Sequence, residues 1–586
     1  MKENDLLIFN LHRRYLNVSI SFGGFSGIYL LSAFVSENGF DAQAYAGDLV
    51  AGKKLLDEAC LLGKVRVIGL YCDYENVTEN IFLCRYIKEN YCLPVIVGGP
   101  QATALKKDFF VKSGCDVIVR YEGEVTVLEL LQYFVDGYGC LENIKGIAFL
   151  KNDKLEINPD REVIENLDSL PFIDVKYALD KRFHSTEASI MTGRGCPFHC
   201  AFCHEGHHTR KVRFRSVKNV LKEVDMFLEK MPAEGGYILF TDDTFTLVPE
   251  RVKAICEGLK ERKKRFNFNW FCEGHIHTLF LYPEMIQYIA DAGAQRIQLG
   301  IEAGTQKVLD YYRKGSTLEE IIEVVKTCKE KGISQIFSNI ILGGPFYDYD
   351  TYQKDLDFAK KLLKIGQGTV EIGIVSYWPL PETTITNNPQ NFGMAIKDYD
   401  FYTSASDFPL AETERLNVWE ICELISDMRN EIRDFMLKQL REKQIPIKLI
   451  KKWFYFFHHY HTSGMWFDCL ASDKLLFNYY DLICSGEAET WDMVKDKPLE
   501  CHPMRIDALC DHFNIKNGII TIYDIFNSVL EKELIRYSIG KLSIKEIISV
   551  LQGKDEFKDY GKSLSEEILK FYQEADKQQI MVFSRY

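Results

Sequence analysis

The chain has 586 residues and a formal net charge of −13. This length exceeds what one hydrophobic core organises, so we expect two to four domains, and the acidity disfavours a general binder of nucleic acid or anionic membranes. The sequence holds neither a signal peptide nor an apolar run of about 18 residues, which predicts a cytoplasmic protein without a membrane span and with reduced cysteines.

Residues 1–150 alternate between strand and helix patterns, which predicts a doubly wound, Rossmann-like parallel sheet. The apolar strand candidates are 6–10, 42–46, 65–72, 93–99 and 115–120, and helix-like stretches such as 27–39 and 77–91 separate them. Ligands of such sheets bind beyond the carboxyl ends of the strands. The candidate binding residues therefore follow the strands: Tyr71, Cys72, Asp73 and Tyr74; Gly98, Gly99, Pro100 and Gln101; and Glu122, Gly123 and Glu124.

Residues 151–185 are a looser, proline-containing linker, and a second alternation begins near Ala188. Its six strand candidates are 188–193, 237–242, 268–274, 296–303, 334–343 and 370–378, and the first five precede helical patterns. Six such units predict a partial (β/α)6 TIM barrel over 186–385, shorter than the closed eight-unit form. Residues 386–586 are expected to form a mostly helical C-terminal domain that carries substrate specificity.

Three cysteines, Cys196, Cys200 and Cys203, lie on one short loop after the first barrel strand. A structural zinc site needs four ligands. An iron–sulfur cube takes one thiolate per iron, so three cysteines leave one iron open to bind a substrate, and we predict a catalytic 4Fe-4S cluster. A zinc site completed by a nearby histidine remains the alternative; the histidines within reach are His199, His204, His207 and His208.

The spacing C-x3-C-x-aromatic-C, with Phe202 at the aromatic position, resembles the radical S-adenosylmethionine (SAM) superfamily. The segments 239–245, 299–310 and 339–345 resemble that family's second-, fourth- and fifth-strand motifs. The resemblance implies that SAM chelates the open iron and is cleaved reductively to methionine and a 5′-deoxyadenosyl radical. It also implies the residues that contact SAM, namely Phe202, Asp242, Asp243, Glu302 and Gly343.

The N-terminal sheet, placed directly before this barrel, resembles the cobalamin-binding domain of B12-dependent radical SAM enzymes. The segments 95–103 and 115–124 carry the likeness, although Tyr121 stands where the group usually has glycine. Cobalamin contacts are thereby implied for the residues after the strands. No D-x-H-x-x-G motif is present, which fits this group, in which histidine does not serve as the lower cobalt ligand. A flavodoxin-like domain with another ligand, or none, is the alternative.

The resemblance implies methylation of an unactivated carbon in a peptide or small molecule, with an external electron donor such as flavodoxin or ferredoxin and without nucleic acid. Ring contraction, cyclisation and carbon–carbon bond formation are the alternatives within the group, and a non-catalytic cobalamin and iron–sulfur sensor is a distant one. A tRNA methylthiotransferase is disfavoured, because the N-terminal cysteines occur singly. The aromatic stretch 451–467 is interpreted first as a buried helix and second as a wall of the substrate cavity.

Overall fold

The computed structural model describes residues 4–12, 26–73, 76–178, 187–204, 211–232, 235–397, 408–460, 463–506, 513–516, 519–522 and 528–585. The chain divides into two compact units, one formed by residues 1–366 and 372–429 and the other by residues 367–371 and 430–586. Within the described ranges, none of the helices combines the length and the apolar character needed to cross a bilayer.

The first unit opens with a seven-stranded sheet in the order β2-β1-β3-β4-β5-β6-β7. The strands are β1 (Asn4–His12), β2 (Ala42–Asp48), β3 (Val65–Tyr71), β4 (Val95–Gly98), β5 (Val117–Val119), β6 (Ile147–Lys151) and β7 (Lys154–Ile157). Strands β1 to β5 are parallel, which confirms the predicted doubly wound sheet. The sheet then continues into residues expected as linker, because Asn152 and Asp153 both adopt positive φ and close a tight antiparallel hairpin.

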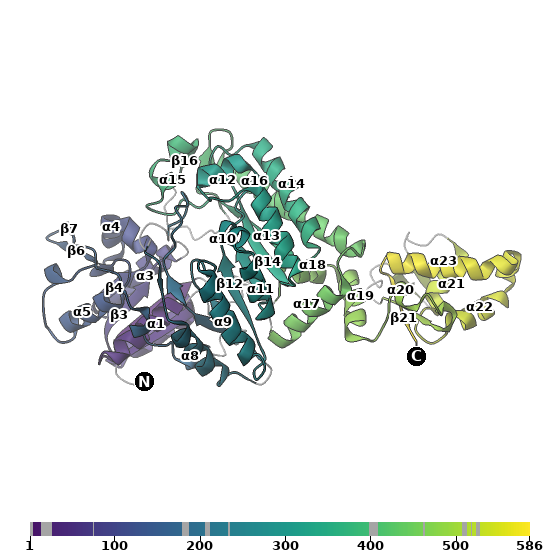
Figure 1. Ribbon diagram of the computed structural model, residues 1–586, viewed down its shortest axis with the longest axis horizontal. Coiled ribbons are helices and arrows are strands. Elements are labelled where there is room, and N and C mark those ends of the chain that lie inside the picture. The colour runs from purple at the N-terminus through teal and green to yellow at the C-terminus, as the bar shows by residue number, and fades with distance from the viewer. Residues whose placement is uncertain are drawn as a thin grey trace. The chain divides into compact units, whose positions relative to one another are not determined.

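Helices cover both faces of this sheet (Figure 1). They are α1 (Ser26–Glu37), α2 (Leu49–Leu61), α3 (Val77–Asn90), α4 (Pro100–Ser113) and α5 (Glu124–Phe134). Leu56, Leu83 and Phe109, from α2, α3 and α4, pack with Phe9 and Leu70 of the sheet into one apolar core. Helices α1 and α5 contact each other and flank the opposite face. Alternate residues of each strand therefore face different helices, as a doubly wound sheet requires.

A six-stranded sheet follows, and its strands stand in chain order, which confirms the partial barrel. The strands are β8 (Glu187–Ile190), β11 (Gly236–Phe240), β12 (Phe268–Gly274), β13 (Arg296–Leu299), β14 (Gln335–Leu342) and β15 (Val370–Ser376). The intervening helices are α8 (Val217–Leu228), α9 (Pro249–Arg262), α10 (Ile276–Leu281), α11 (Glu284–Asp291), α12 (Gln306–Tyr312), α13 (Leu318–Glu330) and α14 (Tyr349–Gly366). Local sequence marks their starts: Thr317 and Glu320 form a capping box that begins α13.

The first barrel strand is shorter than predicted. It ends at Ile190, and a two-stranded ribbon of β9 (Gly193–Arg194) and β10 (Arg213–Phe214) follows. The chain leaves the sheet because Thr192 and Gly193 donate hydrogen bonds to the Asp242 carboxylate instead of to a neighbouring strand. This β9–β10 ribbon frames the loop that carries the three cysteines.

The rest of the chain is mostly helical, as predicted. Its helices are α15 (Thr384–Asn387), α16 (Val418–Arg441), α17 (Ile447–Tyr460), α18 (Met465–Ser472), α19 (Lys474–Ser485), α20 (Trp491–Val494), α21 (Val529–Tyr537), α22 (Ile544–Gln552) and α23 (Leu564–Lys577). Short antiparallel pairs are β16 (Met394–Ile396) with β17 (Ala411–Thr413), β18 (His502–Arg505) with β21 (Met581–Ser584), and β19 (Phe513–Lys516) with β20 (Ile519–Ile522). The aromatic stretch forms α17, where Trp453, Phe454 and Tyr460 are buried, which favours a packing role.

Candidate active site

The cysteine loop leaves the carboxyl end of the first barrel strand. Cys196, Cys200 and Cys203 are partly exposed and form no disulfide. Among the described residues, no three Cys, His, Asp or Glu side chains converge tightly enough to hold a single metal ion. A four-iron cluster binds each thiolate to a different iron and therefore needs its ligands spread apart. Three thiols on one loop are the donors that such a cluster takes. His207 and His208 of the zinc alternative lie outside the described residues.

Contacts from the segments after β11 and β12 and from α12 hold this loop in place. The Gly195 amide donates to the Asp243 carboxylate over 3.2 Å, and the Ala201 amide donates to the Tyr312 carbonyl over 2.8 Å. Phe198 stacks on His275, which follows the third strand, with ring centroids 3.6 Å apart and an interplanar angle of 7°. The backbone around the three thiols is therefore fixed before any ligand binds, an arrangement that pre-organises a metal site.

Two adjacent acids at the end of β11 have different environments. Asp242 is 4% exposed, and its carboxylate accepts hydrogen bonds from the Thr192 amide and hydroxyl and from the Gly193 amide. Asp243 is exposed at the mouth of the barrel and accepts one bond, from Gly195. The geometry favours a structural role for Asp242 in shaping the base of the cysteine loop, and it leaves Asp243 as the acid that a ligand can reach.

Glu302 lies just beyond β13, bridged to Ile340 of the fifth strand, with φ of +65°. A non-glycine residue in this left-handed region stores strain, which is typical of functional positions. Its carboxylate accepts a 2.8 Å bond from Lys314, a residue that sequence reasoning missed. Burial alone lowers the pKa of Lys314, but the charge of Glu302 and the nearby Cys200 and Cys203 raise it above its usual range. The ammonium therefore stays charged beside the cysteine loop.

A third acid, Glu273, is the penultimate residue of β12 and was not predicted. Burial, together with the charge of Asp243, raises the pKa of Glu273 from its usual 4.5 to about 7. Its carboxylate accepts a 3.2 Å bond from Gln298. Asp243, Glu273 and Glu302 thus stand at the ends of three consecutive strands, the edge at which barrel sites are built. Such an acidic rim, with Lys314 beside it, suits a ligand that carries both an ammonium and a carboxylate.

The remaining predicted SAM residues lie at the same edge. The Phe202 ring packs edge-on against Tyr312 at 4.8 Å, and Gly343, with φ of +73°, directly follows the fifth strand. Two residues beyond Glu302, the Gly304 amide donates to Asp355, a fully buried residue of α14. Asp355 also accepts a 2.8 Å bond from the Tyr347 hydroxyl. Asp355 therefore anchors the turn that carries Glu302 to α14.

A cavity of about 350 Å³ opens at the carboxyl ends of the N-terminal strands, on the face flanked by α1 and α5. Of the predicted cobalamin residues, Tyr71, Gly98, Gly99, Pro100, Glu122 and Gly123 line it. Cys72, Asp73 and Gln101 do not line it, and Tyr74 lies outside the described residues. Cys72 is fully buried and packs in the core instead. The inner wall is apolar, formed in part by Leu6, Ile8 and Gly69, which sequence reasoning missed.

Glycine is required at the rim of this cavity. Gly99 has φ of +108°, and a Cβ atom there would lie 2.3 Å from the Cys72 carbonyl oxygen. The loops after β3 and β4 can approach each other only because position 99 lacks a side chain. Because the two loops pack directly against each other, the space above the strand ends stays free. The cavity therefore fits a large ligand that contacts the backbone of these loops.

Two residues of the barrel also line this cavity: Arg194, two positions before Cys196, and His204, directly after Cys203. The His204 Nδ1 atom lies 2.9 Å from the Pro381 carbonyl oxygen. The cysteine loop and the cavity of the N-terminal sheet therefore border each other.

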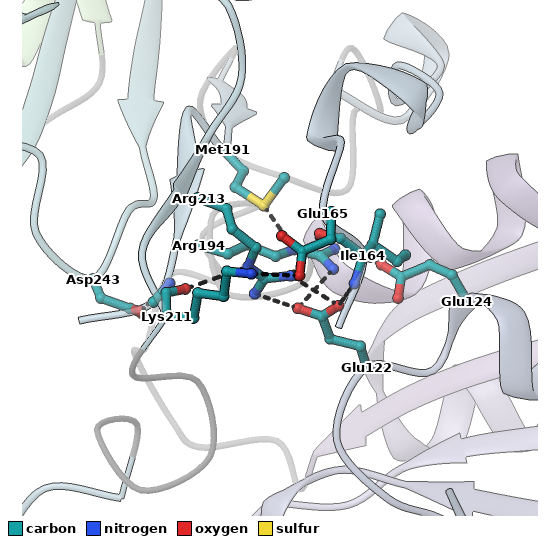
Figure 2. Close-up of polar contacts among 10 residues, drawn as sticks. Glu122, Glu124, Ile164, Glu165, Met191, Arg194, Lys211, Arg213 and Asp243 are labelled. Carbon is teal, nitrogen blue, oxygen red and sulfur yellow. Dashed lines mark hydrogen bonds and ion pairs between the residues drawn. The ribbon is translucent and has the colours of Figure 1, made fainter. Parts of the chain in front are cut away.

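Glu122, predicted to bind cobalamin, is engaged in ion pairs (Figure 2). Both of its carboxylate oxygens accept bonds from the Arg213 guanidinium, at 2.6 and 3.2 Å, and the Ile164 amide adds a 2.9 Å bond. Burial alone raises the pKa of Glu122, but the bonds from Arg213 and the charge of Arg194 hold it below its usual range. Its side chain is therefore an ionised wall of the cavity.

Part of the chain is similar to a known protein family. Residues 190–359 match the radical SAM superfamily. An uncharacterized methyltransferase of Pyrococcus horikoshii is 28% identical over 293 residues, which cover 49% of this chain and 60% of that protein. The hopanoid C-2 methylase of Rhodopseudomonas palustris is 27% identical over 374 residues, or 62% of this chain and 64% of the methylase. The chain thus spans less than two thirds of either relative.

Among solved structures, the cobalamin-dependent radical SAM enzyme OxsB, determined with aqua-cobalamin bound, has a similar fold. The TM-score is 0.57 at 18% identity, and the match covers 98% of this chain and 84% of OxsB. The likeness therefore includes the N-terminal sheet as well as the barrel. Residues 190–359 are therefore similar to the radical SAM superfamily, and the chain as a whole has the fold of a cobalamin-dependent enzyme of that superfamily.

Proposed function

We propose that the protein is a cobalamin-dependent radical SAM methyltransferase that adds a methyl group to an unactivated carbon of a peptide or small molecule. One observation carries the proposal. Arg194 and His204, which flank the three cysteines in the chain, also line the cavity of the N-terminal sheet. A cluster on the cysteines and a cobalamin in the cavity would face each other, as a reaction that uses both requires.

The residues divide by ligand. Cys196, Cys200 and Cys203 hold the cluster. Asp243 and Glu302 meet the polar groups of SAM, and Phe202 and Gly343 border its adenosine moiety. When bound, the cluster supplies the electron that cleaves SAM, and cobalamin supplies the methyl group. The chain itself orients these groups and keeps water from the reacting atoms.

The rim of the cavity binds cobalamin. Tyr71, Gly98, Gly99, Pro100 and Gly123 provide a surface rich in backbone, and Leu6 and Ile8 provide an apolar interior. An extended, mostly flat cofactor with an apolar appendage is suited to both. Glu122 stabilises the cavity wall through its ion pairs with Arg194 and Arg213. Cys72, Asp73 and Gln101 do not line the cavity and instead support the loops that form its rim.

A second candidate is a radical rearrangement without net methylation, such as a ring contraction or cyclisation. Cyclisation is favoured by 26% identity over 330 residues to the anaerobic magnesium-protoporphyrin IX monomethyl ester cyclase of Rubrivivax gelatinosus. Both candidates need the same three cofactors, an external electron donor such as flavodoxin or ferredoxin, and the reducing conditions of the cytoplasm.

Anaerobic reconstitution with iron, sulfide and cobalamin tests the proposal. With SAM and a reductant, the protein should release 5′-deoxyadenosine; failure to do so with a full cluster would contradict radical chemistry. Comparing metabolites and peptides from cells with and without the protein identifies substrates. SAM labelled with deuterium in the methyl group then separates the candidates, since a methyltransferase product gains the label and a rearrangement product does not.

A further inference from the structure

The loop after β5 and the β9–β10 ribbon meet through two pairs of opposite charges (Figure 2). Glu122 and Glu124 flank Gly123 in the wall of the cobalamin cavity, and Arg194 and Arg213 stand opposite each other in the ribbon. The Arg213 guanidinium donates two hydrogen bonds to the Glu122 carboxylate. The Arg194 guanidinium donates a hydrogen bond to the Glu124 carboxylate and lies 3.5 Å from the Glu122 carboxylate. The four side chains are between 3% and 17% exposed.

Arg194 is also part of the cysteine loop. Its neighbour Gly195 donates the hydrogen bond to Asp243, and Cys196 follows. The Arg194 guanidinium is held from the other side as well, by a 3.1 Å contact from Nε to the Met191 sulfur. A continuous path of bonds therefore runs from the cavity wall at Glu124, through Arg194 and Gly195, to Asp243 at the SAM side.

We infer that Arg194 and Glu124 are positioning residues that couple the two cofactor sites, so that cobalamin and SAM each strengthen the binding of the other. This inference rests on the proposed function. A buried charge pair has few alternative geometries, because each charge left unpaired is costly. A ligand that fixes the loop of Glu122 to Glu124 therefore also fixes Arg194, and with it the Gly195–Asp243 bond. Coupling of this kind is reciprocal by thermodynamic necessity.

The test measures the affinity for hydroxocobalamin of protein that holds its cluster, without reductant, in the presence and absence of saturating SAM. In the wild type, SAM should tighten hydroxocobalamin binding by about fivefold or more, within the usual range of site-to-site coupling. In Glu124→Gln, which keeps the shape and removes the charge, the ratio of the two affinities should fall to near one. Arg194→Lys, which keeps the charge but loses the planar guanidinium and its paired N–H donors, should give an intermediate ratio of the two affinities.

Glu165→Gln is the matched control. Glu165 pairs over 2.6 Å with Lys211, next to the same ribbon, but both side chains are more than 60% exposed. This variant should keep the wild-type ratio. The electron paramagnetic resonance spectrum of the reduced cluster provides a second readout: cobalamin should alter it in the wild type and in Glu165→Gln but not in Glu124→Gln.

The outcomes separate this inference from the proposed function. If hydroxocobalamin or SAM fails to bind the wild type, the proposed function is wrong. If both bind but the ratio is one in the wild type, or is the same in the wild type and Glu124→Gln, the coupling is refuted and the proposed function stands. Should Glu124→Gln fail to fold, the ratio measured for Arg194→Lys decides in the same way.

Discussion

Glu302 and Lys314 face each other at the mouth of the barrel with 2.8 Å between carboxylate and ammonium, and their side chains are 12% and 11% exposed. The pair joins the strained end of the fourth strand to Lys314, the second residue after α12. Because both charges are largely removed from water, neither is stable without the other or a ligand that replaces it. A SAM molecule carries both an ammonium and a carboxylate, so its ammonium can pair with Glu302 and its carboxylate with Lys314.

Replacement of Glu302 should weaken SAM binding without loss of the cluster. Glu302→Gln keeps the volume but removes a charge-assisted bond of roughly 1.5–3 kcal/mol, so the affinity for SAM should fall about tenfold or more. Anaerobic equilibrium binding at matched iron content measures the change. Glu261→Gln is the control, since Glu261 pairs with Lys264 at the surface and should leave binding unchanged. Equal affinities in all three proteins would show that the fourth-strand motif has been misread.

Removal of the three thiols should remove the iron. The variant with alanine at Cys196, Cys200 and Cys203 should lose the charge-transfer absorption and all cleavage of SAM, because the three irons that are bound to the protein lose their ligands. Iron and sulfide analysis after anaerobic reconstitution gives the result. Cys140→Ser changes a half-buried single thiol and should keep a full cluster. About four irons per chain in the triple variant would place the cluster elsewhere.

Glycine at position 99 should be essential to the cobalamin cavity. In Gly99→Ala the new Cβ would meet the Cys72 carbonyl oxygen at 2.3 Å, and φ of +108° adds strain of about 1–3 kcal/mol. We expect a lower melting temperature and a loss of hydroxocobalamin binding of tenfold or more. Gly139→Ala is matched in backbone, with φ of +91°, but has open space around it. It should lose stability only, so equal losses of cobalamin binding in both variants would refute a special role for position 99.

The sequence predicted which edge of each sheet holds the candidate residues, because strand periodicity and chain order determine where parallel strands end. It could not rank the residues found there. Asp242 and Asp243 are adjacent and chemically identical, and only burial distinguishes the acid that shapes the cysteine loop from the acid that a ligand can reach. Glu273 ends a predicted strand, so the same rule would have found it. Lys314 follows a helix, and no spacing rule connects it to Glu302.

Stability should depend on pH through Asp355, the buried acid behind the Glu302 turn. Burial raises the pKa of Asp355 from its usual 3.8 to about 7, although bonds from Gly304 and Tyr347 lower it. In the unfolded chain the carboxyl ionises near pH 4, whereas in the folded protein it keeps its proton up to about pH 7. The folded state therefore binds more protons between these values, and stability is lost as the pH rises through this window, by roughly 4 kcal/mol at most.

Asp355→Asn removes the titrating group and keeps the oxygen that accepts from the Gly304 amide. Relative to the wild type, the variant should gain stability as the pH rises from about 4 to about 7, seen as a difference in melting temperature that grows over this window and then levels off. The control is Asp357→Asn, on the exposed side of the same helix, which should follow the wild type at every pH. A constant difference between Asp355→Asn and the wild type across the range would mean that Asp355 is already ionised at pH 5. Its bonds to Gly304 and Tyr347 would then outweigh the cost of burial, and the Glu302 turn would rest on a carboxylate instead of a protonated acid.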